Sequence, residues 1–379
     1  MKILWICGSR IIGGAERVTL QLAALLRGRG HWLGASCPSD SALSQALARA
    51  GLPTYAARLG GSSNFRAVAA IRRSLDDIVP DIALVTTADE WVWSCLARRR
   101  MQHARLVLVR HMALRLNWRV RLLANYRADA VVAVSNAVRH SLTGRLGIRP
   151  ERLHVIHNPV RFPPRATVPD SDQRAGARTA LALPRGGRWV GFFGGLSRAK
   201  GLRDVVCAVS RANKELGSTN LLVCGRAADE QEGWSVAALT QQLGMKDNVH
   251  YLGEIERVEE ALTAVDAVVV ATHRELSEAL PATLLEAMAC GTPVLGYATG
   301  GIAEAIGEDG EAGRLARADN VDDLSRQLIE LLGDPTGAQR MATAALARTR
   351  RLFDSEQAAD RYEQLFSLLC ARRPVAANR

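Results

Sequence analysis

Short apolar runs alternate with longer amphipathic segments along the first part of the chain. The runs are rich in Val, Ile and Leu, as is typical of strands buried on both faces of a parallel sheet. They cover Ile3–Ile6, Trp32–Cys37, Ile82–Val85, Leu106–Val109 and Ala130–Val134. Between the first two runs, Glu16–Arg29 carries apolar residues at helical spacing, so a helix that covers the sheet is predicted there.

The same alternation recurs after Arg161–Gly187, a segment rich in Pro and Gly that reads as a linker followed by the first helix of a second domain. Leu202–Leu216 has the spacing of a helix in this second half. The further apolar runs predict strands over Trp189–Phe193, Leu221–Cys224, Val249–Leu252, Ala267–Ala271 and Pro293–Leu295. The pattern therefore predicts an α/β fold in both halves.

At 379 residues the chain is too long for one compact core, so two doubly wound domains are expected, over residues 1–165 and 166–352. The last amphipathic segment, Ser355–Leu369, predicts a helix within residues 353–379 that crosses back to the first domain. Two such domains facing one another would place the carboxyl ends of their strands across a central cleft. Open α/β sheets bind their ligands at those ends.

Composition removes several classes of protein. With 48% hydrophobic and 23% charged residues the chain is an ordinary globular protein rather than a disordered one. Its seven cysteines show neither disulfide-framework spacing nor zinc-ligand spacing, so a reducing, cytoplasmic location is expected. The apolar start at Met1–Gly8 is too short for a signal peptide, and Gly and Pro interrupt the longest uncharged stretch, Ala287–Ala303. No membrane-spanning segment is expected.

Positive charge is concentrated in the first half of a chain whose formal net charge is +11. Between Arg98 and Arg127 there are nine arginines and no acidic residue. Such a field attracts phosphate on lipids, substrates or nucleic acids. Met112–Leu123 mixes Arg with Leu, Trp and Val, as an interfacial helix does, although a core-packed helix with exposed arginines has the same pattern. No nucleic-acid-binding module is evident, so an anionic membrane surface is the expected partner and nucleic acid is not.

The segment from Ser277 to Val294 carries the most chemical information. Pro281 suits the first turn of a helix, and Gly291 and Pro293 mark its end. Free backbone N–H groups at the start of that helix would bind a diphosphate or sugar oxygens. Glu286, one turn further in, has two carboxylate oxygens for a vicinal diol such as a ribose. Glu278 and Glu286, taken only as two glutamates eight residues apart, mean little.

Taken as a string, Glu278–Val294 resembles the Glu-x7-Glu signature of family 4 retaining glycosyltransferases. The resemblance implies a GT-B fold of two Rossmann-like domains, the first binding the acceptor and the second a nucleotide-diphosphate sugar. It also implies that Glu278 contacts the donor sugar and that Glu286 binds the nucleotide ribose. The loop between them, which would hold the sugar and phosphate, consists of Ala279, Leu280, Pro281 and Ala282.

Three further segments are similar to the same family. Gly13 and Gly14 match its first strand-to-helix loop, where glycines let the backbone approach a phosphate or the acceptor closely. Their spacing differs from a dinucleotide fingerprint, which argues against a dehydrogenase. Lys200 matches the cation that neutralises the leaving diphosphate. His111 matches a histidine beside the donor sugar and acceptor. The other histidines, His273 among them, are given no role.

One position departs from the family pattern. Gly195 stands where the family has an arginine, which leaves half of the cation pair missing. Arg198 and Arg226 are the candidates to replace that charge. Without a replacement a slow or weakened transferase is expected, because one such donor contributes about 2.7–4 kcal/mol to transition-state stabilisation.

The resemblance leads to a functional hypothesis: metal-independent, retaining transfer of a sugar from a nucleotide-diphosphate sugar, with no other cofactor. A saccharide or lipid-linked acceptor is expected, as in the synthesis of lipopolysaccharide, capsule or another envelope glycan, at the inner face of the cytoplasmic membrane. No Asp-x-Asp metal clamp is expected. The alternatives are a non-hydrolysing sugar-nucleotide epimerase and a basic nucleic-acid-binding protein.

Overall fold

The computed structural model describes residues 1–371 except 62–63, 99–102, 114–115, 146, 165, 227–229, 256, 277 and 308, and the side chains of 230–235 are also outside the description. The chain forms two compact units, Met1–Pro159 with Ser355–Arg379, and Val160–Asp354. The boundaries therefore lie at Pro159 and Ser355 rather than at 165 and 353. The reason is a contact within the second unit, where the Val160 N–H donates to the Phe353 carbonyl at 2.8 Å and both side chains are buried.

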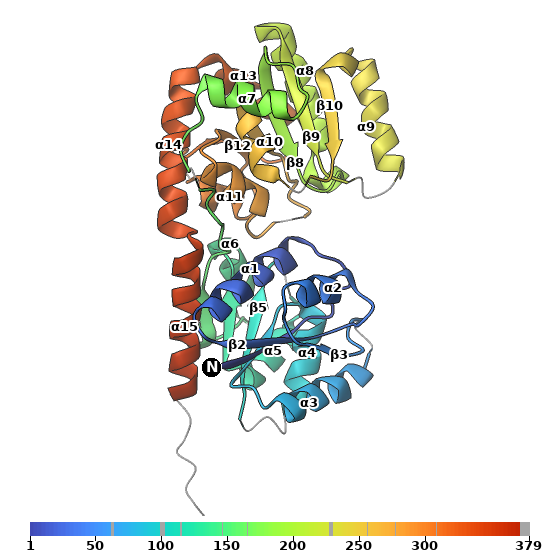
Figure 1. Cartoon of the computed structure of the whole chain (residues 1–379), viewed down its shortest axis with the longest axis vertical. Helices are drawn as coiled ribbons and strands as arrows, with labels where there is room; N and C mark the ends of the chain where they lie inside the picture. The colour runs from blue at the N-terminus through green and yellow to red at the C-terminus, as the bar shows by residue number, and fades with distance from the viewer. Residues whose placement is uncertain are drawn as a thin grey trace, which may run out of the picture. The chain divides into compact units, whose positions relative to one another are not determined.

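The described residues of the first unit form a seven-stranded parallel sheet with helices on both faces (Figure 1). The strands in spatial order are β3 (Thr54–Ala56), β2 (Trp32–Cys37), β1 (Lys2–Ile6), β4 (Ile82–Val85), β5 (Arg105–Arg110), β6 (Ala130–Ala133) and β7 (Leu153–Val155). The helices are α1 (Gly14–Gly28), α2 (Ala42–Arg49), α3 (Arg66–Ile78), α4 (Ala88–Ala97), α5 (Trp118–Arg127), α6 (Asn136–Leu142) and α15 (Ser355–Ala371). Ile3, Leu4 and Ile6 of the central strand are fully buried, as the apolar run predicts.

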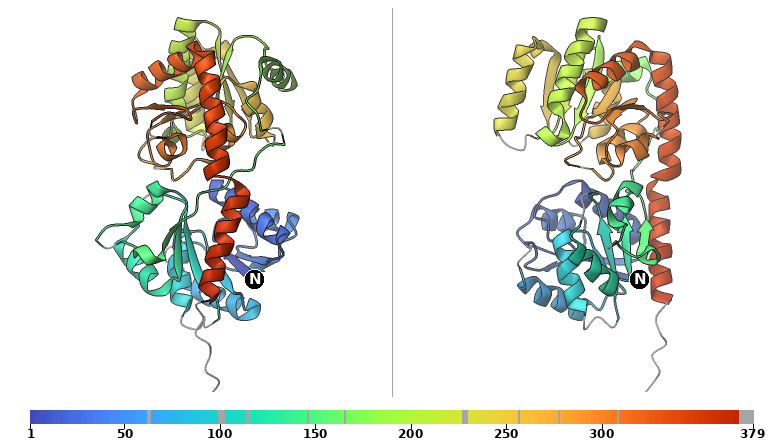
Figure 2. Two further views of the ribbon diagram at one scale, coloured as in Figure 1. Left: turned by 90° about the vertical axis from the view of Figure 1, so that its left-hand side faces the viewer. Right: turned by 180° about the vertical axis from the view of Figure 1, so that it is seen from behind.

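Helix α15 packs along α1 of the same unit (Figure 2). Ala359 and Phe366 of α15 are fully buried. At the end of α1, the Arg29 guanidinium donates to the carboxylates of Glu356, Asp360 and Glu363 of α15. These carboxylates raise the pKa of Arg29, which therefore stays charged. The C-terminal helix is thus bound to the first unit by an apolar face and by one shared cation.

The described residues of the second unit form a six-stranded parallel sheet. The strands in spatial order are β10 (Val249–Gly253), β9 (Thr219–Cys224), β8 (Arg188–Phe193), β11 (Ala267–Val270), β12 (Val294–Tyr297) and β13 (Arg314–Ala316). The helices are α7 (Ser171–Ala180), α8 (Leu202–Leu216), α9 (Glu230–Gln242), α10 (Val258–Ala264), α11 (Ala282–Ala289), α12 (Ile302–Ile306), α13 (Val321–Gly333) and α14 (Pro335–Leu352). Helix α8 has the predicted bounds.

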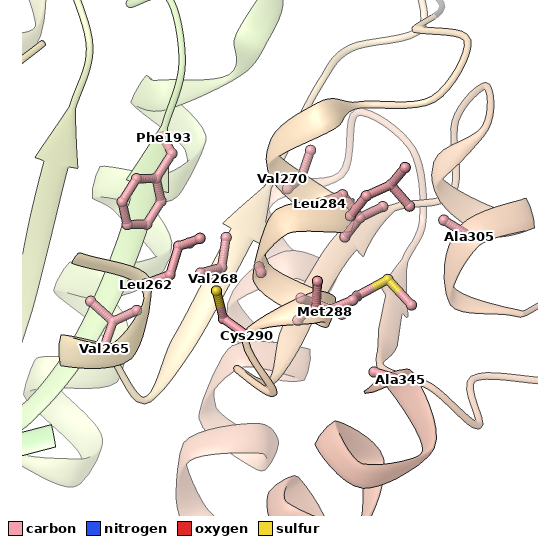
Figure 3. Close-up of a cluster of buried hydrophobic side chains, with 14 of the residues drawn as sticks. Phe193, Leu262, Val265, Val268, Val270, Leu284, Met288, Cys290, Ala305 and Ala345 are labelled. Carbon is pink, nitrogen blue, oxygen red and sulfur yellow. The ribbon is translucent and has the colours of Figure 1, made fainter. Parts of the chain in front are cut away.

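A buried apolar cluster fixes α11 against this sheet. Figure 3 shows Val268 and Val270 of β11 together with Leu284 and Met288 of α11, and all four are buried. Helix α11 presents buried residues on most of its circumference, so its position relative to the strand ends is determined by packing. The polar residues just before it are thereby held at a fixed place.

Both sheets confirm the predicted fold class of two Rossmann-like, doubly wound α/β domains. In each sheet the chain order reverses beside the first strand of the unit, between β1 and β4 and between β8 and β11. Ligands of open α/β sheets bind at the carboxyl ends of the strands at such a switch point. None of the helices in the described ranges is both apolar enough and long enough to cross a lipid bilayer.

Candidate active site

A tight turn carries Lys200 from β8 into α8 at the switch point of the second unit. The 3-10 turn Arg198–Lys200 is followed by Gly201, which has a φ of 74°. A Cβ atom at position 201 would collide with the carbonyl oxygen of Ala271, at the end of β11. Glycine is therefore required here both for the left-handed backbone and for the close approach. The turn lies directly against the end of β11.

The Lys200 ammonium forms an ion pair with Oε1 of Glu278. The other carboxylate oxygen, Oε2, accepts a hydrogen bond from Oγ1 of Thr272 at 2.7 Å. The side chains of Lys200 and Glu278 are 27% and 23% exposed, so each charge is held in place while remaining reachable from solvent. The resemblance assigns Lys200 to the donor's diphosphate and Glu278 to the donor's sugar. The structure brings these two side chains into contact.

Helix α11 begins at Ala282, with Pro281 as its N-cap rather than in its first turn as predicted. The side chains of Ala279 and Leu280 are buried, so this loop can offer a ligand only its backbone. The first intrahelical bond is made by the N–H of Leu285 to the Pro281 carbonyl, which leaves the preceding amides without an acceptor inside the helix. Glu286 is half-buried on the next turn. Ser277 lies outside the described residues.

The loops after β8 and β9 touch through two glycines. A Cβ atom on Gly225 would collide with the Gly194 carbonyl oxygen, and the N–H of Leu196 donates to the Arg226 carbonyl at 2.8 Å. Arg226 is therefore next to Gly195, but its guanidinium pairs with Glu254 at 2.5 Å and is 78% exposed. Arg198 is exposed on the same turn as Lys200. A Cβ atom on Gly195 would meet no atom within 4 Å.

In the first unit, Gly13 is the N-cap of α1 and its N–H donates to Oε2 of Glu16 at 2.9 Å. Gly14 follows as the first helical residue. His111 follows β5, and both of its ring nitrogens are shielded from solvent. Burial and the charge of Arg110 outweigh the side chain of Asn158 and lower the pKa of His111 to about 4. His111 is therefore a neutral imidazole at neutral pH.

Two family profiles match this chain over most of its length. Residues 12–162 match the profile described as Glycosyltransferase Family 4, and residues 174–348 match Glycosyl transferases group 1. The chain belongs to glycosyltransferase family 4. Membership confirms the predicted resemblance.

Curated relatives of this glycosyltransferase are moderately similar to it. N-acetyl-alpha-D-glucosaminyl L-malate synthase of Bacillus anthracis is 31% identical over 45% of this chain and 42% of its own length. D-inositol 3-phosphate glycosyltransferase of Xylanimonas cellulosilytica is 30% identical over 65% of this chain and 59% of its own length. The transferase thus spans less than two thirds of either relative.

Solved structures agree with the fold. HepE of Anabaena in complex with UDP superimposes with a TM-score of 0.86 at 22% identity, covering 97% of this chain and 100% of HepE. The lipopolysaccharide outer core galactosyltransferase WaaB in its apo form gives 0.72 at 17% identity, covering 97% of this chain and 100% of WaaB. At these identities the similarity shows the GT-B fold alone.

Sequence reasoning missed several residues of the transferase. Glu90 is 1% exposed at the switch point of the first unit, where its Oε1 accepts from the Gly60 N–H at 2.8 Å and its Oε2 from the Thr87 hydroxyl. Thr272 and His273, next to the Lys200 turn, had no assigned role either. A threonine or glutamate without a motif around it gives no signal, because these residues are common in loops and first helical turns.

Several of the described arginines in the basic region between Arg98 and Arg127 are paired or buried. Arg98 and Arg105 pair with Asp129, at 2.7 and 3.4 Å, and Arg110 is buried. Arg99, Arg100 and Arg115 lie outside the described residues. The remaining arginines of the field are on α5: Arg119, Arg121 and Arg127. Among the described residues, the arginines of this region that have no acidic partner and are not buried therefore lie on α5.

Proposed function

We propose that this glycosyltransferase moves a sugar, with retention of configuration, from a nucleotide-diphosphate sugar to a saccharide or lipid-linked acceptor. The observation that carries the proposal is the ion pair of Lys200 and Glu278 at the switch point of the second unit, one loop before the start of α11. Crystal structures of HepE, which has the same fold, contain UDP and UDP-glucose, and this supports a nucleotide-sugar donor.

The proposed roles follow from charge and position. The Lys200 ammonium and the first amides of α11 stabilise the negative charge that develops on the departing diphosphate. Glu278 accepts hydrogen bonds from the hydroxyl groups of the sugar, and Glu286 from the ribose. An acceptor hydroxyl attacks the anomeric carbon from the face on which the diphosphate leaves. The bond from that carbon to the acceptor oxygen forms as its bond to the phosphate oxygen breaks, and the hydroxyl proton goes to the leaving diphosphate.

The reaction is proposed to need no metal, because the protein supplies the cation. The sequence does contain one Asp-x-Asp tripeptide, Asp170-Ser171-Asp172, which the expectation above overlooked. Asp170 is the N-cap of α7 and accepts from the N–H of Gln173 at 2.8 Å, which gives it a structural task. Turnover that persists in EDTA supports metal independence, and turnover restored only by added Mg²⁺ or Mn²⁺ contradicts it.

Binding of nucleoside diphosphates is the first test of the donor class. A diphosphate present at 100 times its dissociation constant raises the free energy of unfolding by about 2.7 kcal/mol. We therefore expect one or more of UDP, ADP, GDP and dTDP to raise the melting temperature. The sugar ester of the best binder is then incubated with candidate acceptors, and the anomeric configuration of the product is determined by NMR. An inverted product contradicts the retaining mechanism.

The membrane partner is proposed on the surface of α5. Trp118, Leu122 and Tyr126 recur every fourth residue along one face of the helix and are 48%, 43% and 73% exposed. Arg119 stacks over the Trp118 ring at 5.4 Å, and α5 contains no acidic residue. Aromatic residues beside arginines suit the headgroup region of an anionic bilayer, and binding there would bring the enzyme to a lipid-linked acceptor.

Vesicle flotation tests this part of the proposal. We expect the wild type to float with phosphatidylglycerol vesicles and not with phosphatidylcholine vesicles, and the triple variant Trp118→Ser, Leu122→Ser and Tyr126→Ser to lose binding. As a control, the two exposed arginines Arg211 and Arg326 of the second unit are both replaced by serine. This double variant should still float with the phosphatidylglycerol vesicles. Equal flotation with both lipids contradicts an anionic membrane partner.

A further inference from the structure

The three residues after β11, Ala271 to His273, contact Glu278 and the two neighbours of Lys200 in sequence. Ala271 packs its carbonyl against Gly201, the residue after Lys200. Thr272 donates its hydroxyl to Glu278 at 2.7 Å, and the His273 N–H donates to the Ala199 carbonyl, the residue before Lys200, at 2.9 Å. The end of β11 therefore contacts the turn that carries Lys200 on both sides of the lysine, and it contacts Glu278 through a different residue.

The His273 ring makes a second contact, with the first turn of α8 that follows Lys200. Its Nε2 lies 3.1 Å from Oδ2 of Asp204, in the first turn of α8. The Tyr297 hydroxyl, at the end of β12, donates to the same oxygen at 2.7 Å. Burial and the neighbouring Asp204 raise the pKa of Tyr297, which keeps this hydroxyl protonated as a donor. On its other side the ring has Nδ1 4.0 Å from Oδ1 of Asp319.

Thr272 is fixed by its own contacts as well as by its hydrogen bond to Glu278. Its side chain is buried, and its carbonyl accepts from Oγ1 of Thr299 at 2.9 Å. Because both ends of the threonine are fixed, its hydroxyl can orient only one oxygen of the Glu278 carboxylate, which leaves the other for Lys200. The lysine and the glutamate are thus supported by different neighbours, although those neighbours are consecutive in sequence.

We infer that His273 and Thr272 are two independent positioning residues, His273 holding Lys200 for the diphosphate and Thr272 holding Glu278 for the donor sugar. The inference rests on the proposed function of the Lys200–Glu278 site. Without the His273 ring, the first turn of α8 loses a tie to β11, and the Lys200 ammonium is no longer fixed relative to the phosphates. Without the Thr272 hydroxyl, the Glu278 carboxylate rotates while the lysine turn stays in place.

The separation predicts opposite patterns in binding and turnover. We expect His273→Ala to raise the dissociation constant of UDP about tenfold, and Thr272→Val to leave it within about twofold. We expect Thr272→Val to lower kcat for UDP-glucose hydrolysis by about 10- to 100-fold, since small misplacements at a reacting centre have effects of this size. His273→Gln retains an N–H donor for Asp204 and should restore most of the UDP affinity.

Two quantities are measured on the full chain: the affinity for UDP, by isothermal titration calorimetry, and the rate of UDP-glucose hydrolysis. If GDP, ADP or dTDP binds more tightly than UDP, that diphosphate and its glucose ester are used instead. Thr292→Val is the matched control, because Thr292 is also buried and its hydroxyl donates to the Leu262 carbonyl at 2.8 Å. Thr292 precedes β12 and so lies at the amino ends of the strands, away from Lys200 and Glu278. It should change neither quantity, whatever its effect on the melting temperature.

Each outcome bears on one claim. A His273→Ala variant that binds the diphosphate as tightly as the wild type overturns the assignment of His273. Thr272→Val with unchanged hydrolysis, or with losses of binding and turnover equal to those of Thr292→Val, overturns the assignment of Thr272. A wild type that binds none of the four diphosphates contradicts the proposed function itself, and both assignments fall with it.

Discussion

The two units have the same arrangement of strands around the switch point but place different groups there. In the second unit, Lys200 and Glu278 pair at the strand ends and stay about a quarter exposed. In the first unit, the carboxylate of Glu90 is almost fully buried and both of its oxygens are engaged by Thr87 and the Gly60 backbone. The solvent-reachable charges thus lie at the switch point of the second unit, whereas the buried carboxylate of the first unit holds its loops in place.

The largest expected effect comes from removing the reachable charges of the second unit. Lys200→Ala and Glu278→Ala should each lower kcat by about 10²–10³-fold, the usual effect of deleting one preorganised charge at a developing oxyanion or its partner. Donor turnover is measured at saturating donor. Lys214→Ala, which removes an exposed lysine from the last turn of the same helix α8, should leave turnover unchanged. Wild-type turnover in either site variant would remove the charge-based role.

The next effect concerns pH and the first unit. The pKa of His111 is about 4 in the native state and near 6.5 in the unfolded chain. At pH values between these two, His111 stays neutral in the native state but takes up a proton in the unfolded chain. The unfolded state then binds more protons, so the free energy of unfolding falls as the pH drops through this window. The shift corresponds to roughly 3 kcal/mol. Above about pH 6.5 both states carry a neutral His111, so this residue no longer changes the free energy of unfolding with pH.

Urea unfolding at about pH 7.5 and about pH 4.5 measures the effect. His111→Gln removes the titrating group, so the variant should lose less stability than the wild type between the two conditions. Other histidines contribute equally to both proteins and cancel in the comparison. Identical losses in wild type and variant would show that His111 titrates normally.

A steric change sharpens the contrast at the first switch point. A Cβ atom on Gly8 would collide with the Glu90 carboxylate, so Gly8→Ala should lower the free energy of unfolding by about 1–3 kcal/mol, as overpacking does. Gly14→Ala is the control, because a Cβ atom there meets nothing within 4 Å. Affinity for nucleoside diphosphate should be unchanged in Gly8→Ala, since Gly8 does not belong to the second unit. Equal stability of the two variants would contradict the close packing.

The smallest expected effect adds a charge to the second unit. Gly195→Arg restores the cation that the family pattern has, at a position where a Cβ atom meets nothing within 4 Å. An exposed charge pair contributes about 0.2–1 kcal/mol, so UDP affinity should rise by up to about fivefold. If affinity stays constant while Arg226→Ala lowers it, the missing charge is already supplied by Arg226. If neither variant changes affinity, Lys200 acts without a second cation.

Much of this architecture is predictable because its signals are local. The buried strands and helix α8 are visible as apolar runs and helical spacing, and Glu278 lies in a dense motif with Glu286. The edge strands β3, β7 and β13 were missed, because their exposed or half-buried residues, such as Thr54 and Arg314, give no apolar run. The contacts of Thr272, His273 and Glu90 depend on which strand ends are neighbours, and that information lies in the sheet order rather than in any segment.

The most direct test of the central claim is calorimetric titration of nucleoside diphosphates into the wild type and into Lys200→Ala and Glu278→Ala. The account predicts that at least one of the diphosphates binds the wild type, that Lys200→Ala weakens this binding about tenfold or more, and that Glu278→Ala changes it little because the ligand has no sugar attached. Equal affinity in the wild type and Lys200→Ala would contradict it.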